Sequence, residues 1–211
     1  MDYATICSGI DAPSVAWAEL GWTPLFFSEI EHFPCAVLKY WYPKVPNLGD
    51  MTKFKEWPNY DLTDGIICAG TPCQAFSIAG LRKGLSDPRG NLTLTFLSIL
   101  SRYRPRWVLW ENVPGVQSEE TGAFDSFIVG LQEIGYGVAW TILDAQYFGV
   151  AQRRERVFVV GHIGNWKRPA AVLFDKTCLC GYPAPSREKG EGTAETVEDS
   201  VGNGCRERER E

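Results

Sequence analysis

The 211-residue sequence has little of what a membrane or exported protein requires. No apolar run approaches the ~20 residues that a membrane-spanning helix needs. The opening residues, "MDYATICSGI", lack a basic segment followed by a long apolar stretch, so we expect no signal peptide. The absence of both signals predicts a soluble protein of the cytoplasm with no membrane partner.

The cysteine content does not fit a disulfide framework. Seven is an odd number, and the residues are scattered along the chain rather than regularly spaced. Such a pattern is typical of a reducing compartment. Cys178 and Cys180, with distant Cys205, lack the spacing of a zinc knuckle and have no histidine nearby. We therefore expect free thiols and no metal site.

The acidic net charge of −5 argues mildly against nucleic-acid binding, but the basic residues are clustered. This distribution is compatible with a basic face on an acidic protein, although such clusters are more often ordinary solvated surface. The clusters are Arg82, Lys83 and Arg89; Arg102, Arg104 and Arg106; and Arg153, Arg154 and Arg156.

Strand and helix patterns alternate along most of the chain. Apolar runs predict strands at 3–7, 24–29, 64–69, 107–110, 138–143 and 157–162, and amphipathic segments predict helices at 12–20, 33–41, 92–104 and 124–134. This order predicts an α/β fold with a doubly wound, mostly parallel sheet.

The composition changes near residue 166. The run "RPAAVLF" is compatible with one more strand, but the residues after it are polar, rich in Gly and Pro, and without periodicity. We therefore expect a catalytic domain over residues 1–164 and a polar, flexible tail over 165–211.

Polar side chains follow several predicted strands, at the sheet edge where α/β proteins bind ligands. Cys73 in "GTPCQAFS" lies just past a buried strand, on a loop stiffened by Pro72. Glu111 in "VLWENVPG" is delivered to the same edge, where partial desolvation suits a carboxylate to proton donation. In "QRRER", alternate spacing places Gln152, Arg154 and Arg156 on one face leading into a strand.

A second set of residues suggests a nucleotide-like ligand. Ser8 and Gly9 form a strand-to-helix turn whose backbone amides can hold a polar group. Glu29 ends the second strand, where an acid suits ribose hydroxyls, although a helix-start acid is an equally good interpretation. Asp50 in "LGDM" is placed to accept from an adenine amino group.

Taken together, "PCQAFS", "ENV" and "QRRER" in this order resemble the phage and bacterial cytosine-5 DNA methyltransferases of restriction-modification systems, over roughly residues 3–164. The resemblance implies a Rossmann-like fold that binds S-adenosylmethionine and DNA. It implies that Cys73 is the nucleophile, that Glu111 holds the cytosine ring nitrogen, and that Arg154 and Arg156 lie near the base with Gln152 in support. The implied cofactor residues are Ser8, Gly9, Ile10, Glu29, Ile30, Asp50, Met51, Pro72, Asn91 and Leu92.

The resemblance leaves alternatives open. No target-recognition domain or final closing helix is evident, so we expect either a truncated enzyme or one whose second polypeptide supplies them. A tRNA cytosine-5 methyltransferase would use the same three motifs, and an inactive module that binds nucleic acid or cofactor is a further alternative. A redox protein built on Cys73 is weaker, because Cys68 lies inside a strand.

Overall fold

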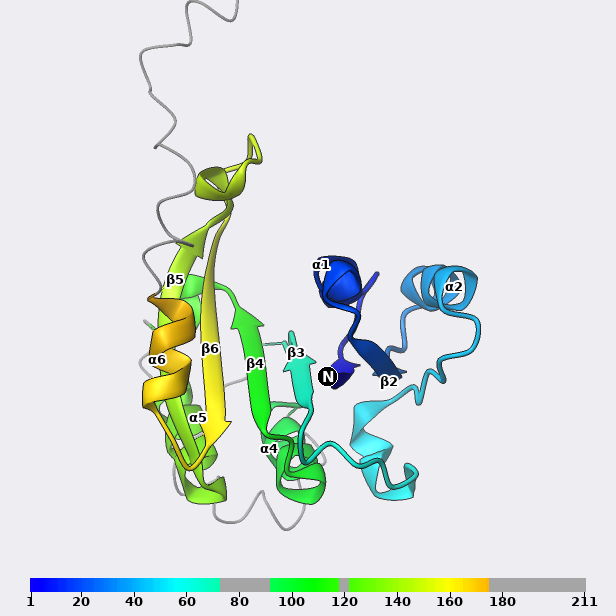
Figure 1. The fold of residues 1–211 in the computed structure, drawn as a ribbon, viewed down its shortest axis with the longest axis horizontal. Helices are drawn as coiled ribbons and strands as arrows, with labels where there is room; N and C mark the ends of the chain where they lie inside the picture. Colours follow the sequence, from blue (N-terminus) through cyan, green and yellow to red (C-terminus); the bar gives the residue numbers. More distant parts are fainter. Residues whose placement is uncertain (73–91, 118–121, 175–211) are drawn as a thin grey trace, which may run out of the picture.

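The computed structural model describes residues 1–72, 92–117 and 122–174, which are organised around a six-stranded sheet (Figure 1). The strands are β1 (Asp2–Ile6), β2 (Thr23–Ser28), β3 (Ile66–Ala69), β4 (Trp107–Asn112), β5 (Tyr136–Asp144) and β6 (Glu155–Ile163). The α-helices are α1 (Ala12–Trp17), α2 (His32–Trp41), α4 (Leu92–Tyr103), α5 (Ala123–Ile134) and α6 (Lys167–Leu173). Short 3-10 helices are η1 (Ala18–Leu20), η2 (Met51–Glu56), η3 (Pro114–Gln117) and η4 (Ala145–Phe148).

The strands lie in the order β2-β1-β3-β4-β6-β5. β1 pairs in parallel with β2 and β3, and β3 pairs in parallel with β4. β6 is antiparallel to both neighbours, β4 and β5, so five strands share one direction and β6 runs against them. The predicted α/β fold with a mostly parallel sheet is confirmed.

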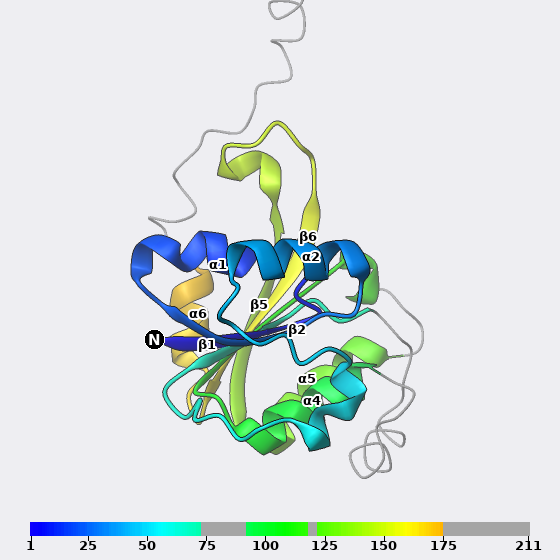
Figure 2. The ribbon, with the colours of Figure 1, turned by 90° about the vertical axis from the view of Figure 1, so that its right-hand side faces the viewer.

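Helices cover both faces of the sheet, as doubly wound folds require. Figure 2 shows α1 and α2 on one side and α4 and α5 on the other. The core lies largely between the sheet and the second pair, where the Trp110 ring centroid lies 4.4 Å from that of Phe127 on α5. Leu97 on α4 is fully buried in the same cluster.

Most predicted elements are observed with bounds shifted by one to three residues, and one segment has a different structure. "RPAAVL" forms helix α6 instead of a strand, because Pro169 fixes a helical φ near its start and the paired alanines favour helix. α6 packs on β5 and β6 (Figure 1). The folded part of the chain thus continues past the boundary expected at residue 164. Residues 175–211 lie outside the described residues, and the rest of the expected tail stays a prediction.

The β4 strand is longer than predicted, and this changes the setting of Glu111. Pairing with β6 continues through Asn112, which lies opposite Val157, so Glu111 lies within the strand and not after it. The parallel strands end at one edge of the sheet, which we call the carboxyl edge. Because β6 runs the other way, it begins there, and Arg156 is brought opposite the end of β4.

Candidate active site

The turn between β1 and α1 has a strained backbone. Cys7, Gly9 and Asp11 have φ angles of 53°, 56° and 64°, a region that costs non-glycine residues about 1–3 kcal/mol each. A Cβ placed on Gly9 would meet no atom of the described residues within 4 Å, so these residues leave the space beside this glycine open. Strain of this kind is typical of ligand-binding turns.

Glu29 ties this turn to the end of β2. Its Oε2 accepts from the Gly9 amide at 2.7 Å, and its Oε1 accepts from the Ile30 and Glu31 amides, each at 2.8 Å. The side chain is 9% exposed. Glu29 therefore orders the segment just before α2 and places its carboxylate beside the β1–α1 turn, and its predicted role toward ribose hydroxyls stays a prediction.

Asp50 and Met51 lie at the start of η2. Asp50 Oδ1 caps this helix by accepting from the Thr52 amide at 2.9 Å and from the Thr52 hydroxyl at 2.8 Å. The Met51 side chain is buried, and its sulfur accepts from the Cys7 thiol at 3.6 Å. Asp50 is thus partly exposed above a buried Met51 that supports the turn.

The remaining predicted cofactor residues differ in how far they are exposed to solvent. Ile10 and Ile30 expose 59% and 69% of their surface beside the turn. Ser8 is partly buried, and its hydroxyl donates to the Thr5 carbonyl at 3.0 Å. Pro72 is exposed after β3, and Leu92 is partly buried at the start of α4. Cys73 and Asn91 lie outside the described residues.

Glu111 and Arg156 form an ion pair at the carboxyl edge. Arg156 Nε lies 2.9 Å from Glu111 Oε1, and the two side chains expose 22% and 33% of their surface. The other carboxylate oxygen faces the strand that leads to Cys73, because a Cβ placed on Gly70 would lie 3.5 Å from Glu111 Oε2. The two oxygens of Glu111 therefore have different neighbours.

Two cavities meet at Glu111 and Arg154. One, of about 440 Å³, extends from the β1–α1 turn at Cys7 and Ser8 to these two residues. The other, of about 300 Å³, is lined by Glu111, Arg154 and Arg156 with apolar neighbours that include Phe158. Gln152 precedes β6, is exposed and lines neither cavity, so its supporting role stays a prediction.

Two other cysteines, Cys7 and Cys68, line the larger of these cavities, and both are poor nucleophiles. Burial, with a smaller contribution from Glu29, raises the pKa of the Cys7 thiol to about 11. Burial raises the pKa of the Cys68 thiol to about 12. The thiolate is the reactive form, and neither thiol forms it readily near neutral pH. These two cysteines are therefore structural.

Sequence reasoning missed the residues that anchor the loop leading to Cys73. Thr71 is buried, its hydroxyl accepts from Trp110 Nε1 at 2.9 Å, and its carbonyl accepts from Asn112 Nδ2 at 2.9 Å. The available signal was that Thr71 and Asn112 both follow predicted strands at the same sheet edge, but the sequence did not show that these strands are neighbours. The loop therefore leaves the sheet from a fixed point beside Glu111.

Asp144 was also missed, and it fixes Arg154. Its Oδ1 accepts from the Arg154 amide at 3.0 Å and from the Gln146 amide at 3.2 Å. Burial raises the pKa of Asp144, but these amides and the Gln146 side chain outweigh it and lower the pKa. Asp144 thus stays charged and holds the β5–β6 connection that carries Arg154.

The fold and site define a Rossmann-like protein with a strained β1–α1 turn on one side of a carboxylate–arginine cluster. The family model of the C-5 cytosine-specific DNA methylases matches residues 1–199. The chain belongs to this family.

Similar proteins come from phages and bacteria. One, of Escherichia phage P1, is named DNA N-6-adenine-methyltransferase and is 42% identical over 241 residues, covering 90% of this chain and 32% of the phage protein. The type II methyltransferase M.DsaV of Dactylococcopsis salina is 34% identical over 178 residues, covering 83% of this chain and 49% of that protein. The chain thus spans half or less of the length of these relatives.

Solved structures share the fold. The S. pombe Dnmt2 methyltransferase superposes with a TM-score of 0.63 at 22% identity, covering 78% of this chain and 51% of that one. A Spodoptera frugiperda DNMT2 variant gives 0.59 at 25% identity, covering 78% of this chain and 50% of that one. Among the residues that the structure describes, no helix is long and apolar enough to cross a membrane.

Proposed function

We propose that this protein transfers a methyl group from S-adenosylmethionine to C5 of cytosine in DNA, with Cys73 as the nucleophile. The observation that carries the proposal is the placement of Glu111, Arg154 and Arg156 together at the carboxyl edge. They lie beside the strand end from which the chain continues to Cys73. Membership of the cytosine-5 family supports the same reaction.

The proposed chemistry assigns different tasks to the side chains. Cytosine C5 is a weak nucleophile, and attack of the Cys73 thiolate on C6 forms an S–C6 bond and moves electron density to C5. Glu111 Oε2 is free to hold the ring nitrogen while Arg156 holds Oε1. Positive charge from Arg154 favours the thiolate. After methylation, loss of the C5 proton to a base expels the thiolate and restores the ring.

The residues present fit S-adenosylmethionine, which when bound supplies the methyl group from a positively charged sulfonium. The open space beside Gly9 admits a ligand close to the backbone. Glu29 and Asp50 place carboxylates near the turn, and exposed Ile10 and Ile30 offer apolar surface beside it. Asp50 Oδ2 makes no hydrogen bond within the described ranges and is suited to accept from an adenine amino group.

The target base distinguishes this proposal from its nearest rival. The phage P1 relative is named for adenine N-6, but the alignment covers only 32% of that protein. Methylation of an exocyclic amine needs no thiol nucleophile, whereas cytosine C5 does. The combination of Cys73 with Glu111 and the two arginines therefore favours cytosine. The covalent-trapping experiment described below compares DNA with RNA directly and so distinguishes the two substrates.

We further propose that specific binding needs more polypeptide than these residues, either in the same protein or as a second subunit. The relatives extend well beyond the part that this chain matches. Large apolar side chains of α1, α2 and the adjacent turns are also exposed, and we call them the α1–α2 apolar surface: Ile10, Val15, Leu20, Ile30, Phe33, Tyr40 and Trp41. Patches of this kind mark interaction sites.

Covalent trapping tests the proposed function. DNA that contains 5-fluorocytosine should form a stable adduct with the wild-type chain and S-adenosylmethionine, because fluorine cannot leave C5 as a proton. Cys73→Ala should form no adduct and transfer no tritiated methyl group while still binding cofactor. Cys205→Ala, in the expected polar tail, is the matched control and should behave as wild type. Turnover by the Cys73→Ala variant would overturn the mechanism, and an adduct with RNA alone would overturn the choice of DNA.

A further inference from the structure

A third cavity, lined mostly by polar side chains, lies at the opposite edge of the sheet, where β6 ends and β4 begins. It has a volume of about 630 Å³, and its lining includes Thr63, Arg104, Arg106, His162, Asn165 and Arg168. We call it the amino-edge pocket. His162 lies six residues after Arg156 on β6, which corresponds to about 20 Å along a strand. The pocket is therefore separate from the candidate active site.

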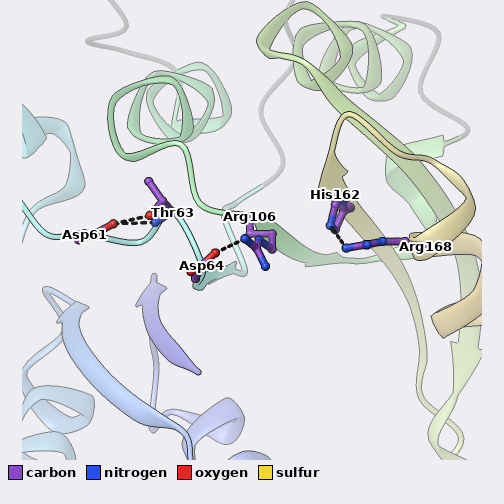
Figure 3. Close-up of polar contacts among 6 residues, drawn as sticks. All are labelled: Asp61, Thr63, Asp64, Arg106, His162 and Arg168. Carbon is purple, nitrogen blue, oxygen red and sulfur yellow. Dashed lines mark hydrogen bonds and ion pairs between the residues drawn. The ribbon is translucent and has the colours of Figure 1, made fainter.

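Three exposed arginines line this pocket, Arg104 and Arg106 from the α4–β4 connection and Arg168 from α6, and each makes a contact that orients it. Arg106 is paired with Asp64, and Arg168 Nη1 donates to His162 Nε2 at 3.0 Å (Figure 3). Arg104 Nη1 donates to the Ile134 carbonyl at 3.2 Å. A guanidinium carries several N–H donors in a planar fork, so these contacts leave donors for a ligand.

His162 acts as an uncharged acceptor for Arg168. Burial lowers the pKa of His162, the Ile163 backbone opposes this by raising it, and the nearby positive charges of Arg168 and Arg106 lower it, so that the net direction is downward. With Nε2 accepting from Arg168, the ring proton lies on Nδ1. This buried atom has no hydrogen-bond partner among the residues that the structure describes. An unsatisfied buried donor costs about 1–3 kcal/mol, so this pair is not optimised for stability alone.

Arg104 shows a similar cost. Its φ of 44° lies in the left-handed region, at the end of α4, where glycine or asparagine is the usual residue. By contrast, neighbouring Arg102 donates to the carbonyls of Phe54 and Trp57 and to Asn59, and does not line the pocket. The basic cluster at 102–106 thus divides between one structural arginine and two that line the amino-edge pocket.

The charge balance of the pocket is positive. Asp64 offsets Arg106, and Asp61 accepts from the amide and hydroxyl of Thr63 at 3.0 and 2.6 Å, so it is turned toward its own loop (Figure 3). Arg104 and Arg168 have no carboxylate partner within the described ranges. Planar guanidinium groups around one cavity are suited to phosphate, whose oxygens accept several charge-assisted hydrogen bonds.

We propose that the amino-edge pocket binds a phosphate group, donated either by a segment of DNA backbone away from the target base or by a free phosphate or nucleotide. Under the methyl-transfer proposal, the target base would lie at the other edge of the sheet, about 20 Å away along β6. A backbone phosphate in the pocket would therefore belong to a second segment. The phosphate site itself does not depend on the methyl-transfer proposal, whereas its assignment to a second DNA segment does.

The first test uses the wild-type chain and inorganic phosphate alone. At constant ionic strength, phosphate should shift the NMR signals of the Arg106 and Arg168 Nε–H groups saturably, whereas chloride should not. The readout needs no variant and no catalysis.

The second test uses a dA·dT duplex, which contains no cytosine, and measures affinity against salt concentration. If DNA is the source, Arg168→Gln should lower the slope of log K against log salt by about 1. Arg168→Lys should retain most of the slope, and exposed Lys55→Gln on η2 is the matched control. Phosphate shifts with an unchanged slope assign the site to free phosphate or nucleotide. No shifts and an unchanged slope would overturn the proposal.

Discussion

Glu111 illustrates how neighbours divide the work of one carboxylate. Its Oε1 is held by Arg156 at 2.9 Å, while Oε2 faces Gly70 and the loop that follows. The ion pair fixes the side chain without using the oxygen that faces the proposed base. A charge pair this exposed contributes little to stability, so its value lies in orientation.

Replacement of Glu111 by Gln should therefore slow the chemistry without loss of cofactor. The amide keeps the shape but loses the proton supply and the charge that holds Arg156, so the single-turnover rate of tritium transfer should fall roughly a hundredfold or more. Cofactor affinity, measured by calorimetry, should stay unchanged. Glu133→Gln, on the exposed face of α5, is the matched control. Normal turnover with lost cofactor affinity would assign Glu111 to the other pocket.

His162 predicts a dependence of stability on pH. Burial and two arginines lower the pKa of this histidine in the folded protein. As the pH falls, the histidine is therefore protonated in the unfolded chain before it is protonated in the folded chain. The free energy of unfolding should therefore decrease as the pH falls below about 6.5, the usual histidine value. Denaturant titrations should show this decrease weakened in His162→Gln. Exposed His32→Gln is the control, and the same pH dependence in both variants would contradict the prediction.

At the scale of elements, the sequence predicts the strands and helices that have a clear hydrophobic periodicity. It does not predict structure that depends on strand pairing or on packing against other elements. The apolar runs of β1, β3 and β6 and the amphipathic α5 follow directly from local pattern. The extension of β4 over Glu111 depends on its antiparallel partner β6, which no local signal reveals. Likewise, α6 depends on the surface that β5 and β6 offer.

Gly137 on β5 shows how close the approach of α6 is. A Cβ placed there would overlap the Trp166 backbone nitrogen, and backbone cannot move aside as a flexible side chain can. Gly137→Ala should therefore displace α6 and lower the free energy of unfolding by about 1–3 kcal/mol, the usual cost of overpacking.

Gly115→Ala provides the comparison for this substitution, because none of the described residues has an atom within 4 Å of its Cβ position. Chemical denaturation of both variants measures the difference, and hydrogen exchange of α6 reports the displacement directly. Equal stability of the two variants, with unchanged hydrogen-exchange protection of α6, would contradict the prediction. It would show that α6 can move away from β5 at little cost in free energy.

At the scale of the whole molecule, the candidate site combines residues of very different predictability. Glu111, Arg154 and Arg156 were recognisable because several motifs stand in a characteristic order. Thr71, Asn112 and Asp144 were not, because their roles are hydrogen bonds between segments that only the folded sheet brings together. The exposed α1–α2 apolar surface is likewise a property of the assembled fold.

That surface underlies the last prediction, which is that this chain alone methylates DNA feebly and without clear sequence preference. Reading a DNA sequence requires side chains held in a groove by a folded element, and the described residues supply the sheet that carries the candidate active site. A longer form of the protein, or a second polypeptide that covers the α1–α2 apolar surface, should restore rate and specificity together. Val15→Asp on that surface should block this restoration, whereas Val172→Asp on α6 should not. Bisulfite sequencing of plasmid DNA measures each case. Robust methylation of one short sequence by the purified chain alone would contradict the prediction.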